Sequence, residues 1–336
     1  MKSILFIFLL IFVNYGNASC LDSERLTGVN LAGAEFNSGT LPGTLFKNYV
    51  YPSSSVLTYF KNKNINLIRL PIRWERIQPS AYSNLDSTNL KQITAVASYA
   101  KSNNICLLID IHNYAKYYGI ALSDYSDAED MLYDLYTKLL TNLSDYTDYV
   151  AIGFMNEPAY VTRQYWAEIS QNLVNRLRVA SIQNLIFVAG GGWSGAHSWF
   201  SYSSTDPSNA NLFTDFTDPL NRLVIEMHQY ADSNYSGTKS DCISADKMNT
   251  FLNNVSTWAS NTNHHIFLGE FGLSQDTTCL AVLSSMVQTM NAYPWTGWTY
   301  WAGGAWWSST YVFSIQPSSA GEDKPQMGVI GSYLGK

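Results

Sequence analysis

Charged side chains are scarce in this chain: they make up 14% of its 336 residues, where an ordinary globular protein has about 25%. Hydrophobic residues reach 46%, which excludes a disordered chain, because disordered chains combine high charge with few apolar side chains. The 20 basic residues form no cluster that would hold a nucleic-acid backbone, and the net charge is −6. A neutral, polar substrate suits this composition better than a phosphate polymer, and we expect no nucleic-acid partner.

Motifs for cofactors and metals are also missing. The sequence contains no G-x-x-x-x-G-K-[ST] stretch for a nucleotide phosphate and no Cys/His spacing typical of zinc. Internal repeats, low-complexity tracts and Pro/Ser/Thr-rich linkers are missing too, which argues against a structural wall protein. We therefore expect one folded domain.

Only one long hydrophobic run precedes the body of the chain, Ile4–Val13, and it lies between a lysine and a set of small, polar residues. This is the order of a secretory signal peptide, with Gly16 and Ala18 at the −3 and −1 positions of the cleavage site. The run is too short to span a bilayer, and an N-terminal membrane anchor is the alternative interpretation. We predict that residues 1–18 are a signal peptide, that residues 19–336 form the mature domain, and that the protein is secreted.

Secretion changes how the four cysteines are interpreted, because disulfides persist outside the cell. Cys242 and Cys279 flank a predicted helix–strand unit and could pair. Cys106 begins a very apolar strand, where a buried thiol behaves as a small hydrophobic group. Cys20 lies at the start of the mature chain, and the pattern does not place it.

The body of the chain alternates between apolar, strand-like runs and amphipathic, helix-like segments. The strand-like runs are Gly28–Gly33, Asn66–Ile72, Cys106–Asn113, Val150–Pro158, Leu185–Trp193, Leu223–Tyr230, His265–Gly272 and Gly297–Gly304. The clearest helical patterns are Asn89–Asn103, Glu129–Asn142, Arg163–Ala180, Lys247–Asn261 and Leu280–Ala292. Buried parallel strands are continuously apolar, so this alternation predicts a single-domain α/β protein, a (β/α)8 TIM barrel. The alternative, a doubly wound sheet, usually carries G-x-G-x-x-G after its first strand, and Gly28–Gly33 lacks it.

Polar side chains stand at the ends of the predicted strands, and in a TIM barrel these ends form the active face. Charged groups rarely lie in apolar strands without a specific role. Two of these strands end in a glutamate, Glu157 and Glu270, and the two strands face each other across the barrel mouth. A pair of carboxyl groups flanking one cleft is the arrangement that cleavage of a glycosidic bond requires.

The polar strand ends also resemble a known family. The stretches LIRLPIRW, LLIDIHNYA, GFMNEP, MHQYADSNYSGT, LGEFG and WTYWAGG occur in this order, between Gly28 and about Trp307. Together they resemble glycoside hydrolase family 5, and within it the fungal-type cellulases, which are endo-β-1,4-glucanases. The resemblance implies a secreted retaining enzyme in which Glu157 is the general acid/base and Glu270 the nucleophile. It implies a β-glucan substrate, no metal or other cofactor, and a monomeric catalytic domain.

The same resemblance implies a substrate-binding set and a cysteine arrangement. The residues that match the family's binding set are Arg69, His112, Asn156, His228, Tyr230 and Trp301. Cys242 and Cys279 match a disulfide of the fungal-type members, whereas the usual upstream partner of Cys106 is missing, so Cys106 is predicted to be a free thiol. Further tryptophans are candidates for neighbouring sugar subsites, unless they pack beneath loops: Trp74, Trp193, Trp306 and Trp307.

Chemistry gives these residues separate roles. We expect Arg69 to lower the pKa of Glu270, and burial together with the charge of Glu270 to raise that of Glu157. Asn156 would point away from the sugar in a regular strand, so we expect a local distortion that turns its amide toward the 2-hydroxyl. For retention, the two carboxyl groups should lie about 5 to 5.5 Å apart.

Four further acidic residues lie in or near the predicted strands. Asp110 and Glu226 should support the neighbouring histidines, while Glu35 and Glu75 are interpreted as cleft or surface residues.

Two other functions are compatible with the same residues. An endo-β-1,4-mannanase shares the same catalytic frame, and a non-catalytic sugar-binding barrel is a rival of another class. Two histidines and two glutamates could also hold a metal, although the family's chemistry needs none.

Overall fold

A closed barrel of eight parallel strands forms the centre of the computed structural model, which describes residues 19–292 and 294–335. Around the barrel the strands follow the order β1-β10-β9-β8-β7-β6-β3-β2. Their bounds are β1 Leu26–Leu31, β2 Leu67–Ile72, β3 Cys106–Ile111, β6 Val150–Gly153, β7 Ile186–Ala189, β8 Leu223–His228, β9 Ile266–Glu270 and β10 Trp295–Gly303. The predicted (β/α)8 barrel is confirmed, and each predicted strand is present with slightly different ends.

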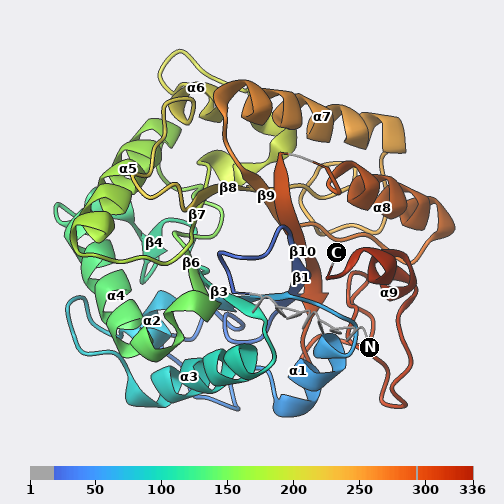
Figure 1. Cartoon of the computed structure of the whole chain (residues 1–336), viewed down its shortest axis with the longest axis horizontal. Helices are drawn as coiled ribbons and strands as arrows, with labels where there is room; N and C mark the ends of the chain where they lie inside the picture. The colour runs from blue at the N-terminus through green and yellow to red at the C-terminus, as the bar shows by residue number, and fades with distance from the viewer. Residues whose placement is uncertain (1–18, 293, 336) are drawn as a thin grey trace, which may run out of the picture.

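Helices surround the strands, and in Figure 1 the colour passes around the ring from blue to red. The helices are α1 Ser54–Lys61, α2 Trp74–Ile77, α3 Ser87–Ser102, α4 Ala128–Asn142, α5 Arg163–Val179, α6 Asn209–Leu212, α7 Ala245–Thr262, α8 Thr277–Thr289 and α9 Pro325–Ile330. The five predicted helices are all present. Several begin at a side-chain cap, such as Asp86 before α3 and Ser244 before α7, which accepts a hydrogen bond from a free backbone N–H of the first turn. Within the described ranges, no helix is long and apolar enough to cross a membrane, and the predicted signal peptide lies outside these ranges.

The interior of the barrel is apolar at one end and polar at the other. The apolar end includes Leu67, Leu108, Phe187 and Phe267, and the last two rings meet edge to face with centroids 5.0 Å apart. Nearer the carboxyl ends of the strands, the interior holds charged side chains that are described below. Gly269 makes room for one of them, because an added Cβ would lie only 2.0 Å from Glu226 Oε1.

Two disulfides tie the chain. Cys242 pairs with Cys279, which confirms that prediction. Cys20 pairs with Cys106 across a sequence separation of 86 residues, so the prediction of a free Cys106 is wrong. The backbone N–H of Cys20 donates to Asp148 O at 2.8 Å, which holds the start of the described chain under the apolar end of the barrel.

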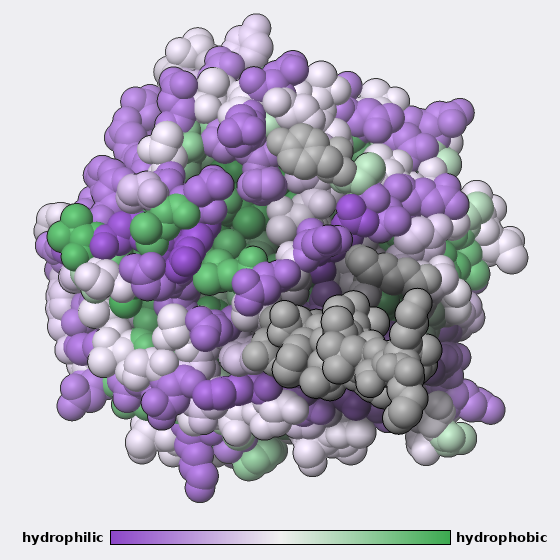
Figure 2. All heavy atoms as spheres, in the orientation of Figure 1, coloured by the Kyte–Doolittle hydropathy of each residue, from purple (hydrophilic) through white to green (hydrophobic). Residues whose placement is uncertain are grey.

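The loops after the strands carry additional structure. A small antiparallel hairpin, β4 Lys116–Tyr117 with β5 Ile120–Ala121, follows β3. On the face drawn in Figure 2, hydrophobic green areas are small and are separated by hydrophilic purple and neutral white. The visible surface is therefore mixed in polarity.

Candidate active site

Glu270 is the last residue of β9, and its carboxylate is held at both oxygens. Arg69 Nη1 donates to Oε1 at 2.9 Å, and the Tyr230 hydroxyl donates to Oε2 at 2.8 Å. Glu270 is 4% exposed. The carboxylate therefore has a fixed orientation at the carboxyl end of the barrel.

Arg69 lies at the centre of the charged side chains that fill the polar end of the barrel interior, and it is completely buried. Besides Glu270, its guanidinium contacts Glu226 Oε1 at 2.9 Å and Asp110 Oδ1 at 3.2 Å, and it donates to Asn156 Oδ1 at 2.9 Å. The carboxylates offset the cost of burying the guanidinium charge. Asp110 and Glu226 thus lie beneath the site, where they also contact the two histidines at 2.8 and 3.2 Å.

Glu157 follows β6, and the chain is distorted there as predicted. Met155 has φ 145° and Glu157 has φ 42°, both in the region that L-residues rarely adopt. Non-glycine residues in such conformations cost about 1 to 3 kcal/mol each and concentrate at functional sites. As a result, the Asn156 amide faces the same side as Glu157, with its Oδ1 on Arg69 and its Nδ2 3.4 Å from His112 Nε2.

The carboxylates of Glu157 and Glu270 approach each other closely. One oxygen from each lies within 4.8 Å of the other, and a ring nitrogen of His228 lies within the same distance of both. His228 Nδ1 donates to Glu157 Oε1 at 2.8 Å and is 3.7 Å from Glu270 Oε2. An approach this close favours the short separation of a retaining pair, about 5 to 5.5 Å, over that of an inverting pair, about 6.5 to 9.5 Å.

The environment shifts the pKa values of the charged groups in different directions. Burial raises the pKa of Glu270, and the charges of His228 and Arg69 oppose this rise without cancelling it. The charge of Arg69 lowers the pKa of Glu270, as expected, but burial outweighs it, so the pKa as a whole is raised. For His228 the balance is opposite: burial disfavours the charged ring, but Glu270, Glu157 and Glu226 outweigh it and raise the pKa to about 10.

His112 stays neutral, because burial lowers its pKa to about 3. Its Nδ1–H then donates to Asp110 Oδ2 at 2.8 Å, which leaves Nε2 as an acceptor for the Tyr114 hydroxyl at 3.2 Å. The ring also lies nearly parallel to that of Trp301, with centroids 5.6 Å apart and an interplanar angle of 17°. Trp301 thus lies against His112, another predicted substrate-binding residue, and is 8% exposed.

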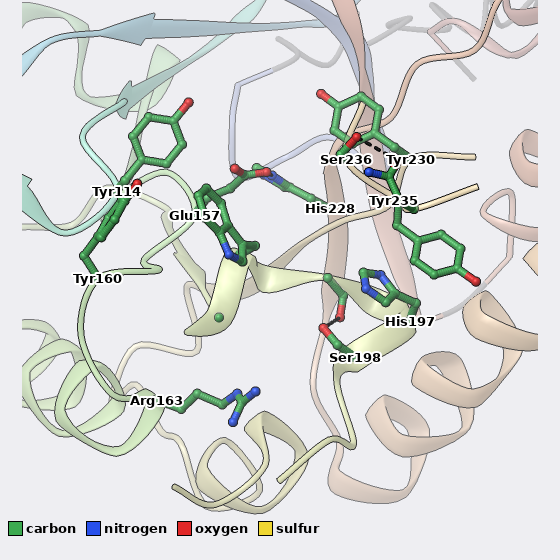
Figure 3. Close-up of a pocket in the computed structure, with 14 residues that line it drawn as sticks. Tyr114, Glu157, Tyr160, Arg163, His197, Ser198, His228, Tyr230, Tyr235 and Ser236 are labelled. Atoms are coloured by element: carbon green, nitrogen blue, oxygen red, sulfur yellow. Dashed lines mark hydrogen bonds and ion pairs between the residues drawn. The ribbon is translucent and has the colours of Figure 1, made fainter. Parts of the chain in front are cut away.

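A cleft of about 860 Å³ opens on one side of Glu157. Figure 3 shows Glu157 and His228 between two walls, with Tyr114 and Tyr160 on one side and Tyr230, Tyr235 and His197 on the other. Trp193 also lines the cleft and is 50% exposed. Aromatic faces with polar side chains between them suit sugar rings, which have flat C–H faces and hydroxyl edges.

The four tryptophans predicted as candidates for sugar subsites differ in burial and in whether they line the cleft. Trp193 lines the cleft, whereas Trp74 is completely buried and donates to Gln78 Oε1 at 3.1 Å, so Trp74 cannot contact a substrate. Trp306 is 39% exposed and does not line the cleft. Trp307 is half-buried and packs against Trp301 at 6.1 Å between centroids.

The expectation for the remaining acids also needs correction. Glu35 and Glu75 are 7% and 0% exposed, so neither is a surface residue. Glu75 accepts from the Asn113 amide and from the Tyr118 N–H at 2.8 Å, and it thereby holds the loop that carries Tyr114.

Several cleft residues lie beyond the strand ends, on loops, on a short 3-10 helix or at the start of α5, and were not found from the sequence: Tyr114, Tyr160, Arg163, His197, Ser198, Asn234, Tyr235 and Ser236. Their signal would have been the aromatic and polar residues that follow strands three to six. That signal is weak, because such residues are common in any loop.

A metal ion would need the free electron pairs of Glu157, His228 and Glu270, the only such group among the residues that the structure describes. Both ring nitrogens of His228 already contact carboxylates, at 2.8 and 3.2 Å, and the raised pKa keeps them protonated. A protonated nitrogen cannot be a metal ligand, so this donor set suits a proton better than a metal.

Comparison with known proteins supports a specific family. A family model described as cellulase, glycosyl hydrolase family 5, matches residues 28–305. Endo-beta-1,4-glucanase B of Aspergillus niger is 29% identical over 310 residues, which is 91% of this chain and 89% of that protein.

Solved structures agree in fold. An endo-beta-1,4-glucanase of Xanthomonas axonopodis pv. citri is 39% identical, with a TM-score of 0.88, over 93% of this chain and 98% of that one. XacCel5A, solved in complex with cellopentaose, is 41% identical, with a TM-score of 0.88, over 92% of this chain and 99% of that one. The family match begins within β1 and extends past the end of β10, so it includes the end of every barrel strand and both glutamates. The chain therefore belongs to glycosyl hydrolase family 5, the cellulase family.

Proposed function

We propose that this chain is a secreted, retaining endo-β-1,4-glucanase that hydrolyses internal bonds of cellulose and related β-glucans. The observation that carries the proposal is the approach of Glu157 and Glu270 to within 4.8 Å at the mouth of one cleft. Each has its own partners, Glu157 on His228 and Glu270 on Arg69 and Tyr230. That difference suits two carboxyl groups with different roles in one reaction.

In the first step, Glu270 attacks the anomeric carbon while Glu157 gives its proton to the leaving oxygen. The C–O bond to the leaving sugar breaks, and an ester bond to Glu270 forms. Arg69 and Tyr230 hold the attacking carboxylate in place. The charged His228 stabilises the carboxylate that Glu157 becomes after it has lost its proton.

In the second step, Glu157 removes a proton from water, which attacks the same carbon and releases Glu270. Two inversions at one carbon retain the configuration. Arg69 holds the Asn156 amide through its oxygen, and the Nδ2–H, 3.4 Å from His112 Nε2, is the donor proposed for the 2-hydroxyl, a contact that strengthens in the transition state.

The substrate proposal rests on the cleft and on the relatives. Around the catalytic pair the cleft is lined mainly by aromatic and hydroxyl-bearing side chains, with Arg163 as its one arginine, which suits an uncharged glucan. The named relatives are endo-β-1,4-glucanases, and one related structure contains cellopentaose. We further propose that residues 1–18 direct secretion, in keeping with two disulfides, and that the mature domain acts as a monomer.

Activity on two polymers tests this proposal. Reducing-sugar release should be faster from carboxymethylcellulose than from mannan, and the first product detected by NMR should be the β-anomer. Glu157→Gln and Glu270→Gln should each lower kcat more than 1,000-fold with little change in Tm, because both side chains keep their shape; such losses are about 4 kcal/mol of transition-state stabilisation. Faster release from mannan would favour the mannanase alternative, and an initial α-anomer would contradict retention.

A further inference from the structure

Trp301 is fixed by a hydrogen bond that the roles proposed above do not use. Its indole Nε1–H donates to the Tyr311 hydroxyl at 3.0 Å, and the ring is 8% exposed. The face of the indole is nearly parallel to the ring of His112, with centroids 5.6 Å apart. The indole plane is therefore set by a ring contact on its face and by one hydrogen bond at its edge.

Tyr311 is itself held firmly by the loop after β10. Its ring stacks on Trp307 with centroids 4.0 Å apart and an interplanar angle of 14°. Trp307 in turn donates to Gly303 O at 3.2 Å and meets Phe36 edge to face at 4.6 Å. The hydroxyl that accepts from Trp301 thus stands on a rigid aromatic support.

The Tyr311 hydroxyl also stays neutral. Burial raises its pKa above the ordinary value, and the charges of Glu270 and Glu35 add to the rise, although the hydrogen bond from Trp301 opposes it. A neutral hydroxyl accepts from the indole at any pH at which the carboxylates work, so the orientation of Trp301 does not depend on the state of Tyr311.

We propose that Tyr311 is a positioning residue that fixes the plane of Trp301 against the sugar that is attacked. This inference rests on the proposed function together with the sequence prediction that Trp301 binds substrate, here the sugar that is attacked. Stacking on an aromatic face depends on the tilt of the face. Without the hydrogen bond the indole can tilt, and the sugar loses contact in both the ground state and the transition state.

A double-mutant cycle tests this role, because Tyr311 should act only through the indole N–H. Tyr311→Phe keeps the stack on Trp307 and removes the acceptor. We expect its kcat/KM on cello-oligosaccharides to fall about fivefold, the worth of one neutral hydrogen bond, mainly through KM. Trp301→Phe removes the N–H, so Tyr311→Phe should cause less than a twofold further loss in that background.

Tyr300→Phe is the matched control, since the Tyr300 hydroxyl donates to Leu273 O at 3.0 Å in the core and does not contact Trp301. It should lower Tm without changing KM. The inference is overturned if Tyr311→Phe leaves kcat/KM unchanged, or if it costs the same fivefold in the Trp301→Phe background. If instead the wild-type chain does not hydrolyse β-glucan, the proposed function fails, which is a separate result.

Discussion

Glu35 is a buried acid that should make the stability of this protein fall as pH rises. It lies just after β1 and accepts from the Gly33 N–H at 2.7 Å through Oε2. Its other oxygen, Oε1, has no hydrogen-bond partner among the residues that the structure describes. Burial raises its pKa from 4.5 to about 8; the hydrogen bond from Gly33 opposes the rise, and the charges of Glu270 and Asp110 add to it.

The sign and size of the effect follow from proton linkage. The folded state keeps a proton on Glu35 between pH 4.5 and about 8, whereas the unfolded state loses it, so unfolding is favoured as pH rises through this window. A tenfold difference in proton affinity between the folded and unfolded states corresponds to about 1.4 kcal/mol. Compared with low pH, where both states hold the proton, the free energy of unfolding is lower by about 1 kcal/mol at pH 5, about 3 at pH 7 and about 4 at pH 8.

Glu35→Gln removes this dependence, because glutamine stays neutral and keeps an acceptor for the Gly33 N–H. Urea denaturation with the disulfides intact, followed by tryptophan fluorescence, should show the variant gaining about 3 kcal/mol on wild type between pH 5 and pH 8. Glu322→Gln is the control, since Glu322 is exposed and undergoes the same chemical change. Parallel stability curves for wild type and Glu35→Gln would refute the reasoning.

Three further predictions follow from the structure. Replacing Cys20 and Cys106 with serine opens a loop of 86 residues and should cost about 4 kcal/mol of unfolding free energy in urea denaturation, and a loss below about 1 kcal/mol would contradict it. EDTA should leave kcat on carboxymethylcellulose unchanged, because both nitrogens of His228 are engaged; an activity loss that a divalent metal restores would contradict this. Trp193→Ala should raise KM for long glucans with Tm preserved, because Trp193 lines the cleft. Trp74→Ala should lower the free energy of unfolding by about 3 to 5 kcal/mol, because Trp74 is completely buried. The reverse pattern would contradict the placing of Trp193 in the cleft and Trp74 in the core.

The barrel could be predicted because its strands are buried on both faces and are therefore continuously apolar. The same reasoning located the carboxyl ends of the strands, so Arg69, Glu157 and Glu270 could be expected together before their distances were known. Even the distortion around Asn156 follows from the alternation of side chains in a regular strand.

Other features depend on contacts between distant segments, which the local pattern does not contain. Cys20 precedes the first strand, so nothing in the alternation of strands and helices indicates Cys106 as its partner. Trp74 lies two residues after the end of β2, but α2 starts at that residue and its ring is buried in the core. Tyr311 lies on a loop, and its contact with Trp301 is set by packing on Trp307.

The degree to which acidic side chains are buried could not be predicted from the sequence either. Glu35 and Glu75 were interpreted as cleft or surface residues, yet both are buried, although acids are mostly exposed in folded proteins. Likewise Arg69 lowers the pKa of Glu270 as expected, but the larger effect of burial raises it. Solvent exclusion is a property of the whole fold, so its size could not be read from the neighbouring residues alone.

The most direct test of the account is to trap the covalent intermediate. A 2-deoxy-2-fluoro-cellobioside with a good leaving group should esterify the enzyme, and mass spectrometry of the digested protein should place the fluorocellobiosyl group on Glu270. An adduct on any other residue, or turnover of this substrate to the inverted product without an adduct, would contradict the proposed roles of Glu270 and Glu157.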